Sequence, residues 1–370
     1  MNNNVFLDQM IAKLEWVTGE VDFLYPSRTV DGLYKNAKCA PFSWTTGFYG
    51  GILWYLYVLT GEERFRELAK KAAERFDEGL TEYTWLSHDV GFQFLPTSVA
   101  DYMLTRDERS KVRALHAATI LAGRYNPKGQ FIRAWNDNPG IDSDMPKTGY
   151  VIIDCMMNTP LLYWASEVTG DPRFRQIANL HADTVIRHFV REDGSVNHIV
   201  VFDPETGAVI SKPMGQGYAE GSSWTRGQAW AIYGFAMAYH YTGEPRYLET
   251  AKKVGDYFAA HMNAEYMPVD FAQPAEPKYE DCSAAAIAAC GYMEIGKYVK
   301  EDNYAACLEV LMDILYRNCD FTDKTQSVLQ NCSEMYHGEG KHGISLIYGD
   351  FYLLEALARL HGKDALFYKK

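Results

Sequence analysis

The sequence lacks the features of a secreted, disulfide-rich or membrane-spanning protein. No apolar stretch reaches the roughly 18 residues that a membrane span requires, and residues 1–4 contain no basic region followed by an apolar one. The 7 cysteines are odd in number and include no Cys-x-x-Cys pair, so we expect free thiols in a reducing compartment. We therefore expect a cytoplasmic protein that has no membrane partner.

Positive charge is also scarce. The chain carries 36 lysines and arginines against 48 aspartates and glutamates, which gives a net charge of -12. Phosphate backbones and anionic membranes are bound by clustered lysine and arginine, so this balance argues against nucleic acid and membrane partners. An acidic substrate is compatible with it, because a single arginine can hold a carboxylate inside an acidic protein.

Several common catalytic and cofactor motifs are absent. The sequence has no His-Glu-x-x-His, no P-loop, no Gly-x-Ser-x-Gly and no Gly-x-Gly-x-x-Gly that opens a helix. His337 and His342 could suggest a metal site, but two histidines on a glycine-rich loop are a weak signal. The motifs therefore give no signal for an organic cofactor and only this weak one for a metal.

Aromatic residues, in contrast, are abundant at 14% of the chain. Their number fits a large core, and it fits equally a cleft whose aromatic faces pack against sugar rings. Trp44, Trp135 and Trp230 are candidates for such sugar platforms, although most tryptophans belong to cores. Composition alone leaves both interpretations open.

One turn recurs along the chain and indicates helical hairpins. Thr-Gly-acid stands at residues 60–62, 169–171 and 242–244, with weaker versions at 105–109 and 300–304. Glycine supplies the left-handed residue that ends a helix, and an acidic residue favours the start of the next helix. A helix that is apolar nearly all round precedes each turn and an amphipathic helix follows it, as expected for inner and outer helices.

The number of these helices predicts the fold class. Inner helices are expected to begin near Trp44, Asp89, Val151, Trp224, Asp281 and Tyr348. Outer helices are expected near Glu62, Asp107, Asp171, Glu244 and Glu301, with a further one around residues 6–17. Together they form an all-α (α/α)6 barrel, with a short β-hairpin at residues 194–210 inserted at its mouth. No linker composition interrupts the chain, so we expect residues 1–370 to form a single domain.

Acidic residues at the starts of inner helices are the candidates for catalysis. Asp89, Asp154, Asp281 and Asp350 occupy such positions, where helix capping is the ordinary role of aspartate. Asp154 differs because its neighbours on both sides are apolar, so we expect its side chain to be buried. Burial raises the pKa of a carboxyl group and keeps a proton available near neutral pH, as general acid catalysis requires.

The segment at residues 215–230 is dense in glycine, aromatic and polar residues. Arg226 lies one turn into its mostly apolar helix and needs an anionic partner. That partner is either a nearby aspartate or glutamate of the protein or a carboxylate of a substrate, and the sequence does not decide between them.

Taken together, these motifs resemble the unsaturated glucuronyl hydrolases of glycoside hydrolase family 88. The resemblance follows the order of the family's motifs over nearly the whole chain and implies an (α/α)6 barrel, in agreement with the helix count. The matching stretches are residues 43–48, 51–54, 88–92, 152–155, 202–207, 224–230 and 348–352.

The resemblance also implies a reaction and a set of site residues. Such enzymes hydrate the C4=C5 double bond of a terminal unsaturated uronic acid on a glycosaminoglycan-type di- or oligosaccharide. By match, Asp154 protonates C4 and helps to activate water, and Asp89 is the second essential acid. The residues implied in substrate binding are Trp44, Trp135, His198, Gln216, Arg226, Trp230 and Tyr336. The resemblance implies no metal and no organic cofactor.

Three alternatives stand beside this reading. An unsaturated rhamnogalacturonyl hydrolase shares the fold and the hydration chemistry but acts on pectin fragments. A sugar 2-epimerase on the same barrel would require paired catalytic histidines at the mouth, and a glycan-binding module would need no buried acid such as Asp154. Fold alone does not separate them, and the sequence specifies no oligomeric partner.

Overall fold

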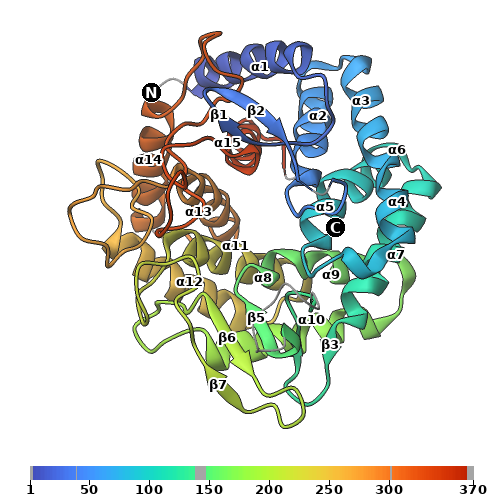
Figure 1. Ribbon diagram of the computed structural model, residues 1–370, viewed down its shortest axis with the longest axis vertical. Helices are drawn as coiled ribbons and strands as arrows, with labels where there is room; N and C mark the ends of the chain where they lie inside the picture. The colour runs from blue at the N-terminus through green and yellow to red at the C-terminus, as the bar shows by residue number, and fades with distance from the viewer. Residues whose placement is uncertain (1–2, 39, 138–146, 301, 365–370) are drawn as a thin grey trace.

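Helices alternate between an inner and an outer ring in the computed structural model, which describes residues 3–38, 40–137, 147–300 and 302–364 (Figure 1). Cys39, for which a free thiol was expected, and Glu301, near which an outer helix was expected to begin, lie outside the described residues. Within them, no helix is both long enough and apolar enough to traverse a bilayer.

The inner ring closes on itself. Its segments contact one another in sequence order, and the last inner helix, α15, packs against both α13 and the first inner helix, α2. The inner segments are α2 (Thr46–Thr60), α5 (Val90–Phe94) continued by the π-helical η2 (Leu95–Val99) and α6 (Ala100–Thr105), α8 (Cys155–Asn158) with α9 (Pro160–Thr169), α11 (Thr225–Thr242), α13 (Cys282–Ile295) and α15 (Ile347–Leu360). The predicted (α/α)6 barrel is thereby confirmed.

The outer ring joins the inner one through the predicted turns. Gly61, Gly170 and Gly243 adopt φ angles of 75°, 72° and 68°, the left-handed conformation that ends a helix. At the weaker turn Arg106 takes this conformation instead, with φ of 62°. The outer helices are α1 (Asn3–Glu20), α3 (Glu63–Glu74) with the short α4 (Phe76–Thr81), α7 (Glu108–Gly123), α10 (Pro172–His188), α12 (Pro245–His261) and α14 (Asp302–Arg317).

Short strands and 3-10 turns lie between the helices. The expected hairpin is present as β6 and β7, but it gains a third strand, β5, which pairs antiparallel with β6. The expectation of a helix beginning near Val151 is therefore wrong, because this β-branched stretch pairs as a strand and α8 begins at Cys155. The short elements are β1 (Pro26–Val30), β2 (Leu33–Asn36), β3 (Tyr125–Asn126), β4 (Phe131–Ile132), β5 (Tyr150–Ile152), β6 (Ile199–Phe202), β7 (Val209–Ser211), η1 (Tyr83–Trp85) and η3 (Lys147–Gly149).

The helix α8 is held between two neighbours by close contacts at glycine. A Cβ atom on Gly234 of α11 would lie 2.5 Å from the Cβ of Met156 and 3.0 Å from its carbonyl carbon. A Cβ atom on Gly91 of α5 would overlap Asn158 at the other end of α8. Because α8 directly follows Asp154, these two contacts fix the helix that carries the candidate acid.

We expect Gly234→Ala to lower the free energy of unfolding by about 1–3 kcal/mol, because the added methyl group overlaps Met156 in a close-packed core. Gly19→Ala in α1 is the matched control, since no atom lies within 4 Å of the Cβ position there. It should leave stability unchanged or raise it by up to about 1 kcal/mol. Chemical denaturation of both variants measures the difference, and equal effects would contradict the close-contact argument.

Candidate active site

Two of the four acids at inner-helix starts do not serve as helix caps. Asp89 and Asp154 occupy the positions directly before α5 and α8, yet neither side chain accepts a hydrogen bond from its helix. Asp281, in contrast, accepts from the backbone N–H of Ser283 and caps α13. The capping alternative therefore applies to Asp281 and fails for the two acids of the candidate site.

Asp350 also has a structural role. It is fully buried in the first turn of α15, where its carboxylate accepts hydrogen bonds from the backbone N–H groups of Val328 and Leu329. The hydroxyl of Tyr34 donates to the same carboxylate at 2.7 Å. These bonds use its acceptor capacity to connect the loop before α15 with the barrel.

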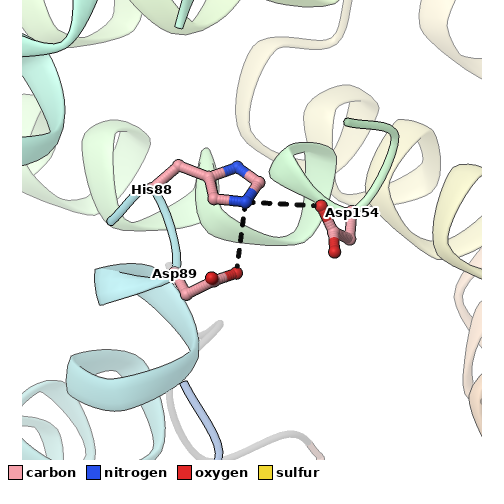
Figure 2. Close-up of side chains that lie close together, drawn as sticks. All are labelled: His88, Asp89 and Asp154. Atoms are coloured by element: carbon pink, nitrogen blue, oxygen red, sulfur yellow. Dashed lines mark ion pairs between the residues drawn. The ribbon is translucent and has the colours of Figure 1, made fainter. Parts of the chain in front are cut away.

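His88 lies between the two uncapped acids (Figure 2). Its Nε2 atom is 3.4 Å from Oδ1 of Asp89 and 3.7 Å from Oδ1 of Asp154. Its side chain is 1% exposed, and burial lowers the pKa of His88, so the ring is neutral near neutral pH. Sequence reasoning did not assign His88 a role, although its position beside Asp89 was a signal.

The Asp154 carboxyl group has the properties expected of a general acid. Its side chain is 20% exposed, and burial, followed by the negative charge of Asp89, raises the pKa of Asp154 well above its usual range. The charge of Arg226 acts in the opposite direction but is the weaker effect. Burial and Asp89 thus favour the protonated form of this group, and its buried Oδ1 atom has no hydrogen-bond partner among the described residues.

His198 supplies a buried N–H donor near this acid. Its Nδ1 accepts a hydrogen bond of 2.9 Å from the backbone N–H of Gln216, so the hydrogen of the neutral ring lies on Nε2. Burial, with the charge of Arg226, lowers the pKa of His198 to about 3, which keeps the ring neutral. The Nε2 atom has no hydrogen-bond partner in the part of the chain that the structure describes.

Arg226 is held by the protein itself. Its buried guanidinium forms an ion pair with Asp281 and donates to the carbonyl oxygens of Ser333 and Glu334. Of the two partners that the sequence left open, the structure thus provides the aspartate. The contact of Arg226 with a substrate stays a prediction, whereas its role in anchoring the loop at residues 333–334 is direct.

The same loop brings Gln216 and Tyr336 into the network. The Gln216 side chain donates to the carbonyl of Glu334 at 2.6 Å, and the backbone N–H of Tyr336 donates to the carbonyl of Gln216 at 2.9 Å. The Tyr336 ring packs edge-on against Tyr218, with ring centroids 4.8 Å apart. Four of the predicted binding residues (His198, Gln216, Arg226 and Tyr336) therefore belong to one connected set of contacts.

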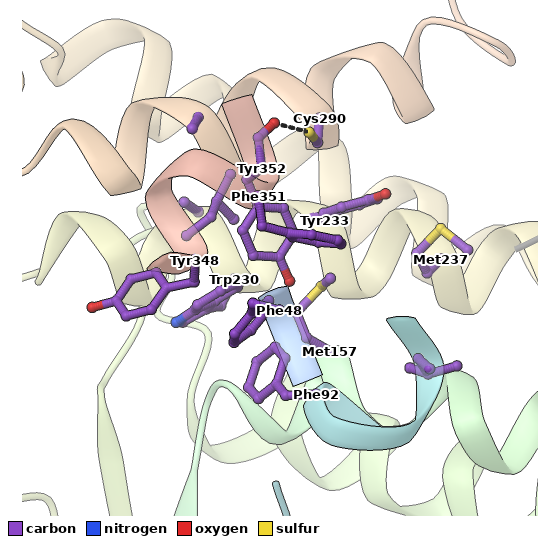
Figure 3. Close-up of a cluster of buried hydrophobic side chains, with 14 of the residues drawn as sticks. Phe48, Phe92, Met157, Trp230, Tyr233, Met237, Cys290, Tyr348, Phe351 and Tyr352 are labelled. Carbon is purple, nitrogen blue, oxygen red and sulfur yellow. Dashed lines mark hydrogen bonds between the residues drawn. The ribbon is translucent and has the colours of Figure 1, made fainter. Parts of the chain in front are cut away.

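The three candidate tryptophans have different environments. Trp44 is partly exposed and packs against Phe92, whose helix begins after Asp89. Trp135 is also partly exposed and lies beside Tyr150, with ring centroids 5.7 Å apart. Trp230 is only 1% exposed and lies inside the aromatic centre of the barrel (Figure 3). Trp44 and Trp135 therefore retain surface for a sugar, whereas Trp230 packs as a core residue.

The acids and His88 could also act as ligands of a cation. Ligand atoms of His88, Asp89 and Asp154 all lie within 4.8 Å of one another. A bound cation would stabilise the deprotonated form of Asp154, opposite to the effect of burial and of Asp89. His337 and His342 do not join this group, because their Nε2 atoms bond to the carbonyl oxygens of Tyr218 and Tyr336.

A surface cavity with a volume of about 900 Å³ lies elsewhere on the described part of the chain. Tyr83, His116, Arg124 and Arg133 are among its lining residues, and neither acid of the candidate site is. We therefore place the candidate active site by its chemistry, at Asp89 and Asp154, rather than by cavity size.

Comparison with known proteins supports this placement. The model of Glycosyl Hydrolase Family 88 matches residues 26–241. The chain is 39% identical to an unsaturated glucuronyl hydrolase from Bacillus sp. (strain GL1) in an alignment of 346 positions that covers 89% of this chain and 89% of that relative. It is 34% identical to an unsaturated chondroitin disaccharide hydrolase from Streptococcus pyogenes serotype M1, covering 86% of this chain and 81% of that relative.

A solved structure agrees in fold as well. The crystal structure of an unsaturated glucuronyl hydrolase from Bacillus sp. GL1, described as responsible for the degradation of glycosaminoglycan, superposes with a TM-score of 0.85. The identity is 35%, and the superposition covers 95% of each chain. Because the family match includes β1 to α11, and with them both uncapped acids, the protein belongs to glycosyl hydrolase family 88.

Proposed function

We propose that this protein removes the terminal 4,5-unsaturated uronic acid from lyase-generated, glycosaminoglycan-type oligosaccharides by hydrating the C4=C5 double bond. The observation that carries the proposal is the Asp154 carboxyl group, which caps no helix, has a raised pKa and lies beside a second acid. The names of the relatives from Bacillus and Streptococcus pyogenes support the substrate class.

The reaction follows from the protonation state of Asp154. The carboxylic acid donates its proton to C4 of the alkene, and the resulting positive charge develops at C5 and the ring oxygen. The carboxylate then accepts a proton from the water that adds to C5. The hemiketal so formed opens and expels the rest of the sugar, which is a different route from attack at the anomeric carbon by two carboxyl groups.

The neighbouring groups prepare this step. The negative charge of Asp89 raises the pKa of Asp154 and thereby keeps the proton on it until the substrate is present. The Nε2–H of His198 and the indole N–H of Trp224 have no partner among the residues that the structure describes. We assign these donors, with the partly exposed rings of Trp44 and Trp135, to the binding of the sugar.

The alternatives fit the site less well. An unsaturated rhamnogalacturonyl hydrolase would use the same chemistry, but the relatives are named for glucuronyl and chondroitin substrates. A 2-epimerase would need a pair of catalytic histidines, whereas His88 is neutral and lies between two carboxyl groups. A binding module would gain nothing from a buried acid that retains its proton.

We further propose that residues 1–370 act as one catalytic domain in the cytoplasm. The closed ring of helices, in which α15 packs on α2, supports a single unit. The six cysteines that the structure describes are all free thiols, which supports a reducing compartment.

The reaction itself is tested with an unsaturated chondroitin disaccharide in D₂O. We expect its ultraviolet absorbance to fall and the released uronic acid to carry deuterium on C4, because the proton that Asp154 donates exchanges with solvent. The saturated disaccharide should not be cleaved, and a chelator should leave the rate unchanged. Equal cleavage of both sugars, or a product without deuterium on C4, would exclude the hydration reaction.

Asp154→Asn should lower kcat by at least about 100-fold, the usual contribution of a general acid. Thermal melting should stay close to that of the wild type, because the change is nearly isosteric and one carboxylate oxygen has no partner among the described residues. Asp350→Asn is the contrasting control: it should lower stability by about 1–3 kcal/mol and leave the activity of the folded fraction intact. Substantial turnover by Asp154→Asn would remove this residue from the mechanism.

The dependence of activity on pH gives a further prediction. The protonated form of Asp154 is the donor, so kcat/KM should fall as pH rises through its pKa. Asp89→Asn removes the negative charge that raises this pKa. We therefore expect the variant to retain only weak activity, with its alkaline limb at lower pH than in the wild type. Profiles of kcat/KM against pH measure both limbs, and a shift to higher pH would contradict the coupling.

A further inference from the structure

A second buried histidine belongs to the outer ring of helices. His181 belongs to α10 and is 0% exposed. Its Nδ1 atom accepts a hydrogen bond of 3.1 Å from the backbone N–H of Ile132. Since a neutral imidazole carries its single hydrogen on the nitrogen that does not accept, Nε2 of His181 is an N–H donor. This buried donor has no partner within the described ranges.

His88 also has a buried ring nitrogen without a hydrogen-bond partner in the described part of the chain. Its Nε2 atom faces the two carboxyl groups, while its Nδ1 atom is buried and, among the residues described, has no partner. Figure 2 shows these two nitrogens on different edges of the ring, with only Nε2 directed at Asp89 and Asp154. A buried nitrogen without a hydrogen bond costs about 1–3 kcal/mol, so a partner for Nδ1 is expected.

Both histidines are attached to the same short stretch of backbone. Ile132 N–H binds His181, and the carbonyl of Ala134 accepts from the backbone N–H of His88 at 3.1 Å. Residues two apart in an extended segment direct their backbone groups to the same edge. The charge of a protonated His88 would also be felt by His181: after burial, it is the second cause that lowers the pKa of His181 to about 3. His181 is therefore neutral and within electrostatic range of His88.

We propose that His181 is a positioning residue that fixes the tautomer of His88. A bound water accepts from the Nε2–H of His181 and donates to Nδ1 of His88, and this places the hydrogen of His88 on Nε2. His88 then presents an N–H donor to Asp89 and Asp154. The opposite tautomer would direct a lone pair at two carboxyl groups, and it would remove the Nδ1 acceptor that the hydrogen of the buried water needs.

The consequence for catalysis rests on the function proposed above. When Asp154 gives its proton to C4, a new negative charge appears 3.7 Å or so from Nε2 of His88. An N–H at that position stabilises the charge, whereas a lone pair would oppose it. His181 thereby acts on the reaction without touching the substrate, as groups behind a first layer of functional residues often do.

Two substitutions separate the two hydrogen bonds of His181. Asparagine places its Oδ1 acceptor where Nδ1 of His181 stood, so His181→Asn keeps the hydrogen bond from the backbone N–H of Ile132. It loses the N–H donor that Nε2 of His181 supplies. Glutamine reaches the position of Nε2 with an amide N–H, so His181→Gln keeps the donor and loses the bond to Ile132. Thr184→Val is the matched control on the same helix, because Thr184 donates to the carbonyl of Gln130 in the same hairpin.

We expect His181→Asn to lower kcat by about 10- to 100-fold with little change in KM or melting temperature. His181→Gln should be less stable but retain more of kcat, and Thr184→Val should lose stability alone. In ¹⁵N spectra of histidine-labelled protein, His88 should have its hydrogen on Nε2 in the wild type and in His181→Gln. In His181→Asn it should become a mixture of tautomers.

A purely structural role for His181 would give the reverse order of kcat, with His181→Asn more active than His181→Gln. That result would overturn the proposal. Hydrogen on Nδ1 of His88 in the wild type would overturn it too. The spectra do not depend on turnover, so the tautomer is tested even if the protein proves inactive on unsaturated sugars. Failure of the proposed function is seen separately, as absence of deuterium on C4 with the wild-type enzyme.

Discussion

The buried ion pair between Arg226 and Asp281 organises the wall of the active site. Two charges taken out of water are costly unless further hydrogen bonds satisfy them, and here the guanidinium also binds the carbonyl oxygens of Ser333 and Glu334. This requirement ties α11 and α13 to the loop at residues 333–336. Gln216 then connects that loop to His198. The position of the His198 ring therefore depends indirectly on the ion pair between Arg226 and Asp281.

The positive charge of Arg226 also lowers the pKa of Asp154. Burial and the charge of Asp89 raise the pKa of Asp154, and Arg226 partly offsets both. An acid with too high a pKa would release its proton poorly, and one with too low a pKa would have none to give near neutral pH. The site thus combines a carboxylate that raises the pKa of Asp154 with a cation that lowers it.

The barrel and part of the site could be predicted from sequence because their causes are local. The Thr-Gly-acid turns determine where each helix ends, and the apolar residues around Asp154 indicate its burial. The strand at Val151 was missed because its partner, β6, lies far along the chain. The role of His88 was missed for the same reason, because it depends on the proximity of Asp154, which precedes another inner helix. Arg226 had two candidate partners, and only the fold identifies Asp281.

The N-terminal hairpin has a consequence for the order in which the protein is completed. Thr29 exchanges hydrogen bonds with Ser345, and Arg28 binds the carboxylate of Glu334 at 3.1 Å. A segment near residue 28 therefore supports a loop that lies 306 to 316 residues later in the sequence. Contacts of such long sequence separation form late in folding. A growing chain therefore exposes His88, Asp89 and Asp154 well before residues 334–345, which complete the loop beside Arg226.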